Sequence, residues 1–392
     1  MAVSTRMFAA DAPICKEGAS PQARDARLLA AVDVGTISTR LILAEVDVSG
    51  RVSPLERQAI ITNLGSGVDA TGALEPAAIE RTCATIGGYG ARLAELAAAG
   101  RPADRIAVTL TSAARDASNA GELLDRLGAM GLEPQVIPGE VEARLSLLGV
   151  TSDFPDKGVL VADIGGGSTE LIEGRRATGA AAGALSVGRG VSYDVGCRRV
   201  TERFFGGAQI PSLAAIDEAR SFVRETLAPF FLTDAGIAPA GVDAISEDAA
   251  GPLADAAGEG AAGTLACVGG TATSLVAVAN RLVPYDSAFV HLHRTSRAQV
   301  SELAARLLDM GPGERRELPG LQPKRADVIA AGALILDELM GLGGFREYVA
   351  SESDSLFGLL ACVRCGLDGV ASPIGWPPRT SDAAAFLATC QR

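Results

Sequence analysis

Two short segments of this chain repeat one pattern: an apolar run, an Asp-x-Gly turn, a Ser-Thr pair and a second apolar run. The first reads LLAAVDVGTISTRLILAEVD over residues 28–47, and the second reads GVLVADIGGGSTELIEG over residues 158–174. Asp163 follows Asp33 by 130 residues, and the glycine and hydroxyl residues after each acid keep the same spacing. Apolar runs around a glycine turn are typical of β-hairpins. The repeat therefore predicts a duplicated chain whose halves each begin with a hairpin of a sheet.

The segments around the two hairpins alternate between helical and strand patterns, which indicates the α/β class. We expect helices over 76–98, 119–130, 140–148, 212–227, 297–308 and 326–338, and strands over 105–111, 134–137 and 263–268. We expect an N-terminal tail over 1–27, a first domain over 28–150, a second domain over 151–370 and a C-terminal tail over 371–392.

Composition excludes several classes of protein. The 392 residues are 48% hydrophobic and 21% charged, which is enough apolar material for a sizeable core. No run of about 18 uninterrupted apolar residues occurs, so we expect no membrane span. The net charge of −12 argues against the dominant basic face that binds nucleic acid or anionic membranes. A polyanionic substrate must therefore be bound by local groups.

Seven scattered cysteines, an odd number in a long chain, predict reduced thiols in the cytoplasm rather than a disulfide framework. Cys362 and Cys365 form a CxxC pair, but neither a second such pair nor a nearby histidine accompanies them. We therefore expect two core cysteines on a helix rather than a redox or metal site.

The second turn, DIGGGSTE from Asp163 to Glu170, has the composition of an anion-binding loop. Its glycines Gly165, Gly166 and Gly167 let the backbone approach a ligand and turn several N–H groups toward one point. The flanking acids would repel a bare phosphate, and Mg²⁺ is the natural mediator because it binds through one or two carboxylates while it keeps phosphate oxygens. The turn predicts a phosphate site with Mg²⁺; a glycine-rich hairpin without a ligand is the alternative.

The first turn, DVGTISTR from Asp33 to Arg40, has a cation where the second turn has Glu170. If the two turns face each other across a cleft between two domains, they can hold a phosphate chain from both sides. The alternative is that Arg40 is an ordinary solvated strand residue.

A third glycine loop, VGGTATS over residues 268–274, follows an apolar strand and enters a helical stretch. Helix N-termini preceded by glycines bind anions through free N–H groups and the helix dipole. Three such loops in one chain favour a phosphate-binding protein.

Two further segments carry charged candidates. The segment TSAARD over residues 111–116 places Arg115 in a loop, either as a phosphate clamp or as a partner of Asp116. Glu140 and Glu142 begin a helix, where interaction with the helix dipole is the alternative to a catalytic role.

These segments together resemble the exopolyphosphatase and guanosine-pentaphosphatase (Ppx/GppA) family, over about residues 28–360. Besides the two hairpin turns, the matching motifs are LGSGVDATG (64–72), TSAARDASN (111–119), GEVEARLSLLGV (139–150), RRVTERF (198–204), GGTATS (269–274) and RADVIAAGALIL (325–336). The resemblance implies an α/β chain of two RNase H-like domains of the actin-like ATPase superfold, with the active site in the interdomain cleft.

The resemblance also implies a reaction and its residues. Family members hydrolyse terminal phosphates with Mg²⁺, and the position of their catalytic base is Glu142 here. Asp163 and Glu170 match the acids that hold the metal and orient water. The implied phosphate-binding residues are Asp33, Gly35, Thr36, Ser38, Arg40, Arg115, Gly165, Gly166, Gly167, Ser168, Thr169, Gly269, Gly270 and Thr271. We expect a cytoplasmic homodimer in which water attacks the terminal phosphorus of inorganic polyphosphate in line.

The sequence departs from the family pattern at three places. Ile37 replaces a common asparagine, Val141 replaces the first of two paired glutamates, and ASESDSLFG over residues 350–358 replaces the usual SDxGLREG. The chain also ends near Arg392, without the helical extension of longer members, which implies the short two-domain form and motivates a hypothesis of preference for shorter polyphosphates.

Three alternatives stay open at this point. Guanosine pentaphosphate contains the same scissile bond, although an aromatic content of 4% favours polyphosphate over a base-stacking pocket. A kinase of the same superfold is disfavoured because Glu142 and the paired acids suit activation of water. The departures motivate a non-catalytic polyphosphate or nucleotide sensor, against which the presence of Glu142, Asp163 and Glu170 argues.

Overall fold

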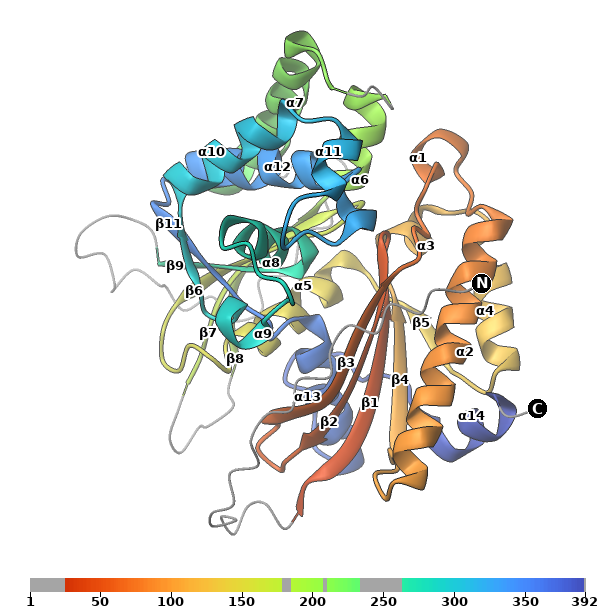
Figure 1. The fold of residues 1–392 in the computed structure, drawn as a ribbon. Helices are drawn as coiled ribbons and strands as arrows, with labels where there is room; N and C mark the ends of the chain where they lie inside the picture. The colour runs from red at the N-terminus through yellow and green to blue at the C-terminus, as the bar shows by residue number, and fades with distance from the viewer. Residues whose placement is uncertain (1–24, 178–184, 207–209, 233–262, 391–392) are drawn as a thin grey trace.

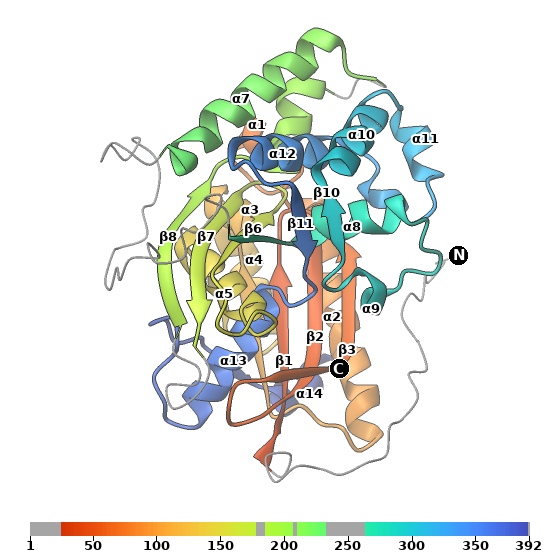
Figure 2. The same cartoon turned by 90° about the vertical axis from the view of Figure 1, so that its left-hand side faces the viewer.

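The computed structural model describes residues 25–177, 185–206, 210–232 and 263–390. Figures 1 and 2 show two sheets, each with helices on its faces. The first sheet contains β1 (Arg27–Val34), β2 (Ser38–Val46), β3 (Val52–Ile61), β4 (Arg105–Leu110), β5 (Pro134–Val136) and β12 (Ser381–Asp382). The second contains β6 (Val159–Ile164), β7 (Thr169–Arg176), β8 (Leu185–Tyr193), β9 (Thr264–Val268), β10 (Arg294–Ser296) and β11 (Glu347–Ala350). The expected tail over 1–27 lies almost entirely outside the described residues.

The helices divide between the two sheets. Around the first sheet lie α1 (Val68–Thr71), α2 (Pro76–Ala98), α3 (Ser112–Asp116), α4 (Ala120–Ala129), α13 (Ser355–Leu367) and α14 (Ala383–Cys390), whereas α5 (Gly139–Val150) lies between the two sheets. With the second sheet lie α6 (Cys197–Val200), a π-helical turn (Thr201–Phe205), α7 (Leu213–Phe231), α8 (Gly269–Ala279), α9 (Ser287–Val290), α10 (Arg297–Leu308), α11 (Pro312–Arg316), a 3₁₀ turn (Pro323–Arg325) and α12 (Ile329–Leu342). None of the described helices is long and apolar enough to cross a bilayer.

The two sheets share one strand plan. In the first, β1, β2 and β3 form an antiparallel meander, and β4 and then β5 add in parallel on the other side of β1. In the second, β6, β7 and β8 repeat the meander, and β9 and then β11 add in parallel beside β6. This plan confirms the predicted duplication and the pair of RNase H-like domains.

The central strands are buried on both faces, which explains their unbroken apolar runs. Along β1, Ala30 and Val32 point into a core with α2, α4 and α14, whereas Leu29 and Ala31 point into a core with α5 and α13. The edge strands β3 and β8 are mostly exposed and have no such run, so the sequence analysis missed them.

The chain returns to the first sheet after β11. Helix α13 packs on β1 and β2 beside α5, β12 pairs with β4, and α14 packs on α2 (Figure 1). The sequence pattern assigns these segments to the second domain and the C-terminal tail. Contacts between distant segments leave no periodic signal, so the pattern contains no information about this return. The domain limits stay a prediction.

Cys362 on α13 is a buried free thiol of this core and Cys365 is a half-buried one, as expected for core cysteines.

Helix α5 lies between the two sheets and crosses α13 at very short range. A Cβ on Gly149 would lie 2.2 Å from the carbonyl oxygen of Asp354, and one on Gly358 would lie 2.1 Å from that of Leu145. Only glycine fits at either position. Side chains of α5 enter both neighbouring cores, Leu145 that of the first sheet and Leu147 that of the second. We call this contact the α5–α13 crossing.

Candidate active site

The two hairpins place their charged residues at equivalent positions. Asp33 on β1 is directly opposite Arg40 on β2, and Asp163 on β6 is directly opposite Glu170 on β7. Equal register in two sheets means that the predicted cation and acid occupy matching sites, as the sequence repeat indicated.

The turns between these strands are also alike. The amide of Gly35 donates to the carbonyl of Ser38 at 3.0 Å, and the amide of Gly165 donates to that of Ser168 at 3.0 Å. Each turn is therefore closed by the same backbone hydrogen bond.

The two turns lie against each other at the interface between the halves. A Cβ on Gly166 would lie 2.8 Å from side-chain atoms of Thr36 and Ile37, and one on Gly167 would lie 2.3 Å from the hydroxyl of Ser112. A space of about 10 Å³ remains between the turns, room for one water molecule at most. A ligand larger than a water molecule does not fit between the turns as they lie in the structure.

Glu142 lies in the first turn of α5 and is held by Arg115. The guanidinium of Arg115 donates to the Glu142 carboxylate at 2.8 Å and to the carbonyl of Ile137 at 2.9 Å. The predicted loop position of Arg115 was wrong, since the residue lies in the short helix α3. Its partner is also not Asp116, which instead accepts from Arg199 at 2.7 Å.

Asp163 and Glu170 each accept a hydrogen bond from a serine that the sequence analysis missed. Ser146 donates to Asp163 at 3.0 Å, and Ser192 donates to Glu170 at 2.7 Å. Ser146 follows Glu142 by one helical turn, so the i, i+4 spacing was a usable signal. Ser192 was not predictable, because its position depends on the pairing of β8 with β7.

All three acids have a raised pKa. Burial raises the pKa of Glu142 to about 7, assisted by Asp33 and Asp163, although Arg115 opposes the shift. Burial raises the pKa of Asp163 to about 6 against the attraction of Arg40. The pKa of Glu170 lies well above its ordinary value because of burial and the charges of Glu142 and Asp163. Such a group of buried, perturbed acids is typical of catalytic sites.

Arg40 lies between two carboxylates from opposite ends of the chain. It donates to Asp33 at 2.7 Å and to Asp354 at 2.6 Å, and its side chain is 20% exposed. Burial alone would lower the pKa of Arg40, but Asp354, Asp33 and Asp163 outweigh it and raise that pKa. The solvated-strand alternative is therefore wrong. Asp354 belongs to the divergent 350–358 segment, and the sequence analysis missed it.

The third glycine loop lies beside Asp163. Helix α8 begins at Gly269, whose φ of +82° suits glycine. The guanidinium of Arg325 lies over Gly270, where a Cβ would be 1.8 Å from it. Arg325 donates to Gln322 at 3.2 Å and has no ion pair with a carboxylate among the described residues. Burial lowers its pKa. Arg325 is thus a cation of this site that no acid of the described segments neutralises, and the sequence analysis missed it.

Two of the predicted phosphate-binding threonines have hydroxyls that serve the fold. The hydroxyl of Thr169 donates to the carbonyl of Val195, and that of Thr271 donates to the carbonyl of Ile164 at 3.2 Å. Both side chains are buried. Any contact of these residues with a ligand therefore depends on their backbone groups.

Arg199 links the two halves at the edge of the site. It donates to the carbonyl of Gly167 at 2.9 Å and forms ion pairs with Asp69 at 3.0 Å and with Asp116 at 2.7 Å. Gly167 belongs to the second hairpin, and the two acids belong to the first half. The neighbouring Arg198 donates to Asn63 at 2.5 Å. These contacts hold the two turns together.

Comparisons with known proteins identify relatives over most of the chain. The model of the Ppx/GppA phosphatase family matches residues 41–342. Exopolyphosphatase 2 of Mycobacterium tuberculosis is 35% identical over 346 residues, which are 84% of this chain and 97% of that protein.

Solved structures agree with this relationship. An exopolyphosphatase-like protein superposes with a TM-score of 0.70 at 32% identity, covering 86% of this chain and 97% of the other. The Aquifex aeolicus member of the Ppx/GppA family superposes with a TM-score of 0.63 at 27% identity, again covering 86% and 97%. The resemblance expected from the motifs is thereby confirmed: the chain belongs to the Ppx/GppA phosphatase family.

Proposed function

We propose that this protein is an exopolyphosphatase, in which water attacks the terminal phosphorus of inorganic polyphosphate and releases orthophosphate. The observation that carries the proposal is Glu142, a carboxylate whose side chain is only 13% exposed, with a pKa raised to about 7, that lies beside two further acids. A general base works best when its pKa is near the operating pH. A base that activates water also fits the hydrolase class of the family.

The proposed roles follow from the contacts. Glu142 accepts a proton from the attacking water while Arg115 holds its carboxylate in place. As the new P–O bond forms, the bond to the bridging oxygen breaks and the shortened chain leaves with the electron pair. That leaving group is already good, so the reaction needs no protein nucleophile. Arg325 and the N-terminal amides of α8 are placed to bind phosphate oxygens.

The acids of the site fit Mg²⁺. No group of three or more His, Cys, Asp or Glu side chains among the described residues forms a ready-made metal site, but Mg²⁺ in phosphoryl-transfer sites commonly uses one or two carboxylates with water and substrate oxygens. Asp163 and Glu170 each have one carboxylate oxygen bonded to a serine, and we assign the other oxygen of each as a ligand of the ion. When bound, Mg²⁺ would neutralise charge on these acids and on the phosphate.

The finer assignments belong to the same proposal. Polyphosphate is preferred to guanosine pentaphosphate because the 35% identical relative is named an exopolyphosphatase. A cytoplasmic location is supported by the free thiols of the described cysteines, which fit a reducing compartment. A homodimer and a preference for shorter chains rest on the resemblance alone.

The test is phosphate release with Mg²⁺ from tripolyphosphate, long polyphosphate and guanosine pentaphosphate, measured in parallel. Glu142→Gln should lose about 10²–10⁴-fold in kcat. Glu140→Gln is the matched control, because Glu140 lies on the same helix in an ion pair with Arg144. Binding of all three compounds without release by the wild type would instead favour a sensor.

A further inference from the structure

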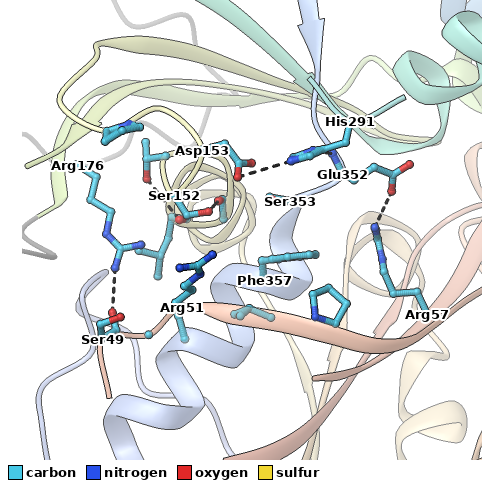
Figure 3. A pocket seen from close by; sticks show the side chains of 18 of the residues that line it. Ser49, Arg51, Arg57, Ser152, Asp153, Arg176, His291, Glu352, Ser353 and Phe357 are labelled. Atoms are coloured by element: carbon cyan, nitrogen blue, oxygen red, sulfur yellow. Dashed lines mark hydrogen bonds and ion pairs between the residues drawn. The ribbon is translucent and has the colours of Figure 1, made fainter. Parts of the chain in front are cut away.

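A second pocket lies at the opposite end of α5 from Glu142. Its volume is about 730 Å³, and residues 148–153 form part of its wall. Gly149, which lines the pocket, follows Glu142 by seven residues of α5, or about 10 Å of helix, so this pocket is distinct from the group of catalytic acids. Figure 3 shows that side chains from several elements point into it.

Both halves of the molecule line this pocket. The first half contributes Arg51 and Arg57, from β3 and the turn before it, and Phe357 of α13. The second half contributes Arg176 at the end of β7 and His291 after α9. A ligand in the pocket would therefore touch both sides of the α5–α13 crossing.

The acids in the pocket already have partners. Glu352 accepts from Arg57 at 2.7 Å and also accepts from the hydroxyl of Tyr285. Asp153 lies 3.7 Å from His291 (Figure 3). Asp153 also accepts from the hydroxyl of Ser351 at 3.4 Å.

Two arginines of the pocket have no carboxylate partner among the described residues. Arg176 donates to the carbonyl of Ser49 at 3.1 Å and has no carboxylate partner within the described ranges. Arg51 points into the pocket in Figure 3, and the described part of the chain gives it no ion pair. These guanidinium groups come from opposite halves. They create a local positive charge on a chain whose net charge is −12.

We propose that this pocket binds a phosphorylated anion, which Arg51 and Arg176 grip from the two halves. The planar guanidinium group matches phosphate oxygens in pairs, and Ser49, Ser152 and Ser353 line the same space. A volume of about 730 Å³ suits a short phosphate chain or a nucleotide. A ligand that bridges the halves favours the separation of the halves at which it fits best. Its binding is therefore coupled to the opening of the catalytic interface. Binding of the anion in this pocket does not require hydrolysis at the catalytic interface.

The test is titration calorimetry on Glu142→Gln, which keeps the ligand intact, with tripolyphosphate, ATP and orthophosphate as separate ligands in the presence of Mg²⁺. We expect one event from the catalytic interface and a second from the pocket. Adding Arg51→Ala and Arg176→Ala should weaken the second event about tenfold or more. Adding Arg306→Ala, an exposed arginine of α10, should change neither.

The ligand arms distinguish the source of the phosphate. A second event with tripolyphosphate assigns the pocket to the polymer, and one with ATP alone assigns it to a nucleotide. A single event for every ligand, or a second event that survives the double substitution in a protein with unchanged melting temperature, overturns the proposal. Absence of turnover in the wild type would instead contradict the proposed hydrolase and leave these binding results unaffected.

Discussion

Arg115 donates to Glu142 at 2.8 Å and thereby joins the helix that follows β4 to the helix that lies between the sheets. The pair places a positive charge against the proposed base and lowers a pKa that burial has raised. The ionisation of Glu142 is thus a balance between Arg115, which lowers the pKa, and burial, Asp33 and Asp163, which raise it.

This balance predicts the pH dependence of the reaction. Since Glu142 must be deprotonated to accept a proton, kcat/KM should rise with pH through about 7. Arg115→Gln removes the charge that lowers the pKa of Glu142, so the rising limb should move to higher pH. Profiles of kcat/KM against pH for the two proteins provide the measurement. An unmoved limb with a reduced plateau would mean that Arg115 acts only on the substrate.

Asp163 should make stability fall with rising pH. Its pKa is raised from 3.8 to about 6, so below about pH 4 both the folded and unfolded forms are protonated and no penalty exists. As pH rises from about 4 to about 6, the unfolded form ionises while Asp163 in the folded form keeps its proton. The free energy of unfolding therefore falls, by about 3 kcal/mol in full. Asp163→Asn should therefore stabilise the protein at pH 8 but not at pH 4. Urea unfolding with EDTA at both pH values tests this; equal effects would contradict it.

The contacts of Arg199 across the interface predict a change in local opening. Arg199→Ala removes two ion pairs between the halves and one hydrogen bond within the second half. Amide hydrogen exchange in residues 63–72 and 111–117 should accelerate, because these segments lose their partners. Arg126→Ala is the control, since Arg126 pairs with Glu80 inside the first half. Identical exchange in both variants would show that Arg199 does not hold the halves together.

Two glycines of α13 should respond oppositely to the same substitution. Gly358→Ala places a Cβ 2.1 Å from the backbone of Leu145, so it should cost about 1–3 kcal/mol of unfolding free energy. A Cβ on Gly366 would meet no heavy atom within 4 Å, so Gly366→Ala should be neutral or stabilising by up to about 1 kcal/mol. Chemical denaturation measures both. A tolerated Gly358→Ala would show that the helices can separate.

The sequence was most informative where local pattern and site coincide. The repeated turns predicted both hairpins, and the acids Glu142, Asp163 and Glu170 do lie close enough to shift one another's pKa. What it could not predict depends on distant contacts. Asp354 meets Arg40 across 314 residues, and the position of Arg325 over Gly270 depends on how two separate segments pack.

The α5–α13 crossing also determines how far each part of the site moves when the halves separate. Gly149 follows Glu142 by seven residues on α5, which places the base about 10 Å along the helix from the crossing. If the crossing serves as the fulcrum of a hinge, a turn of about 10° displaces a group at that radius by only about 2 Å, and displacement grows in proportion to distance. Groups farther from the crossing move farther, so the halves can open at the edge of the site while the base stays close to the fulcrum.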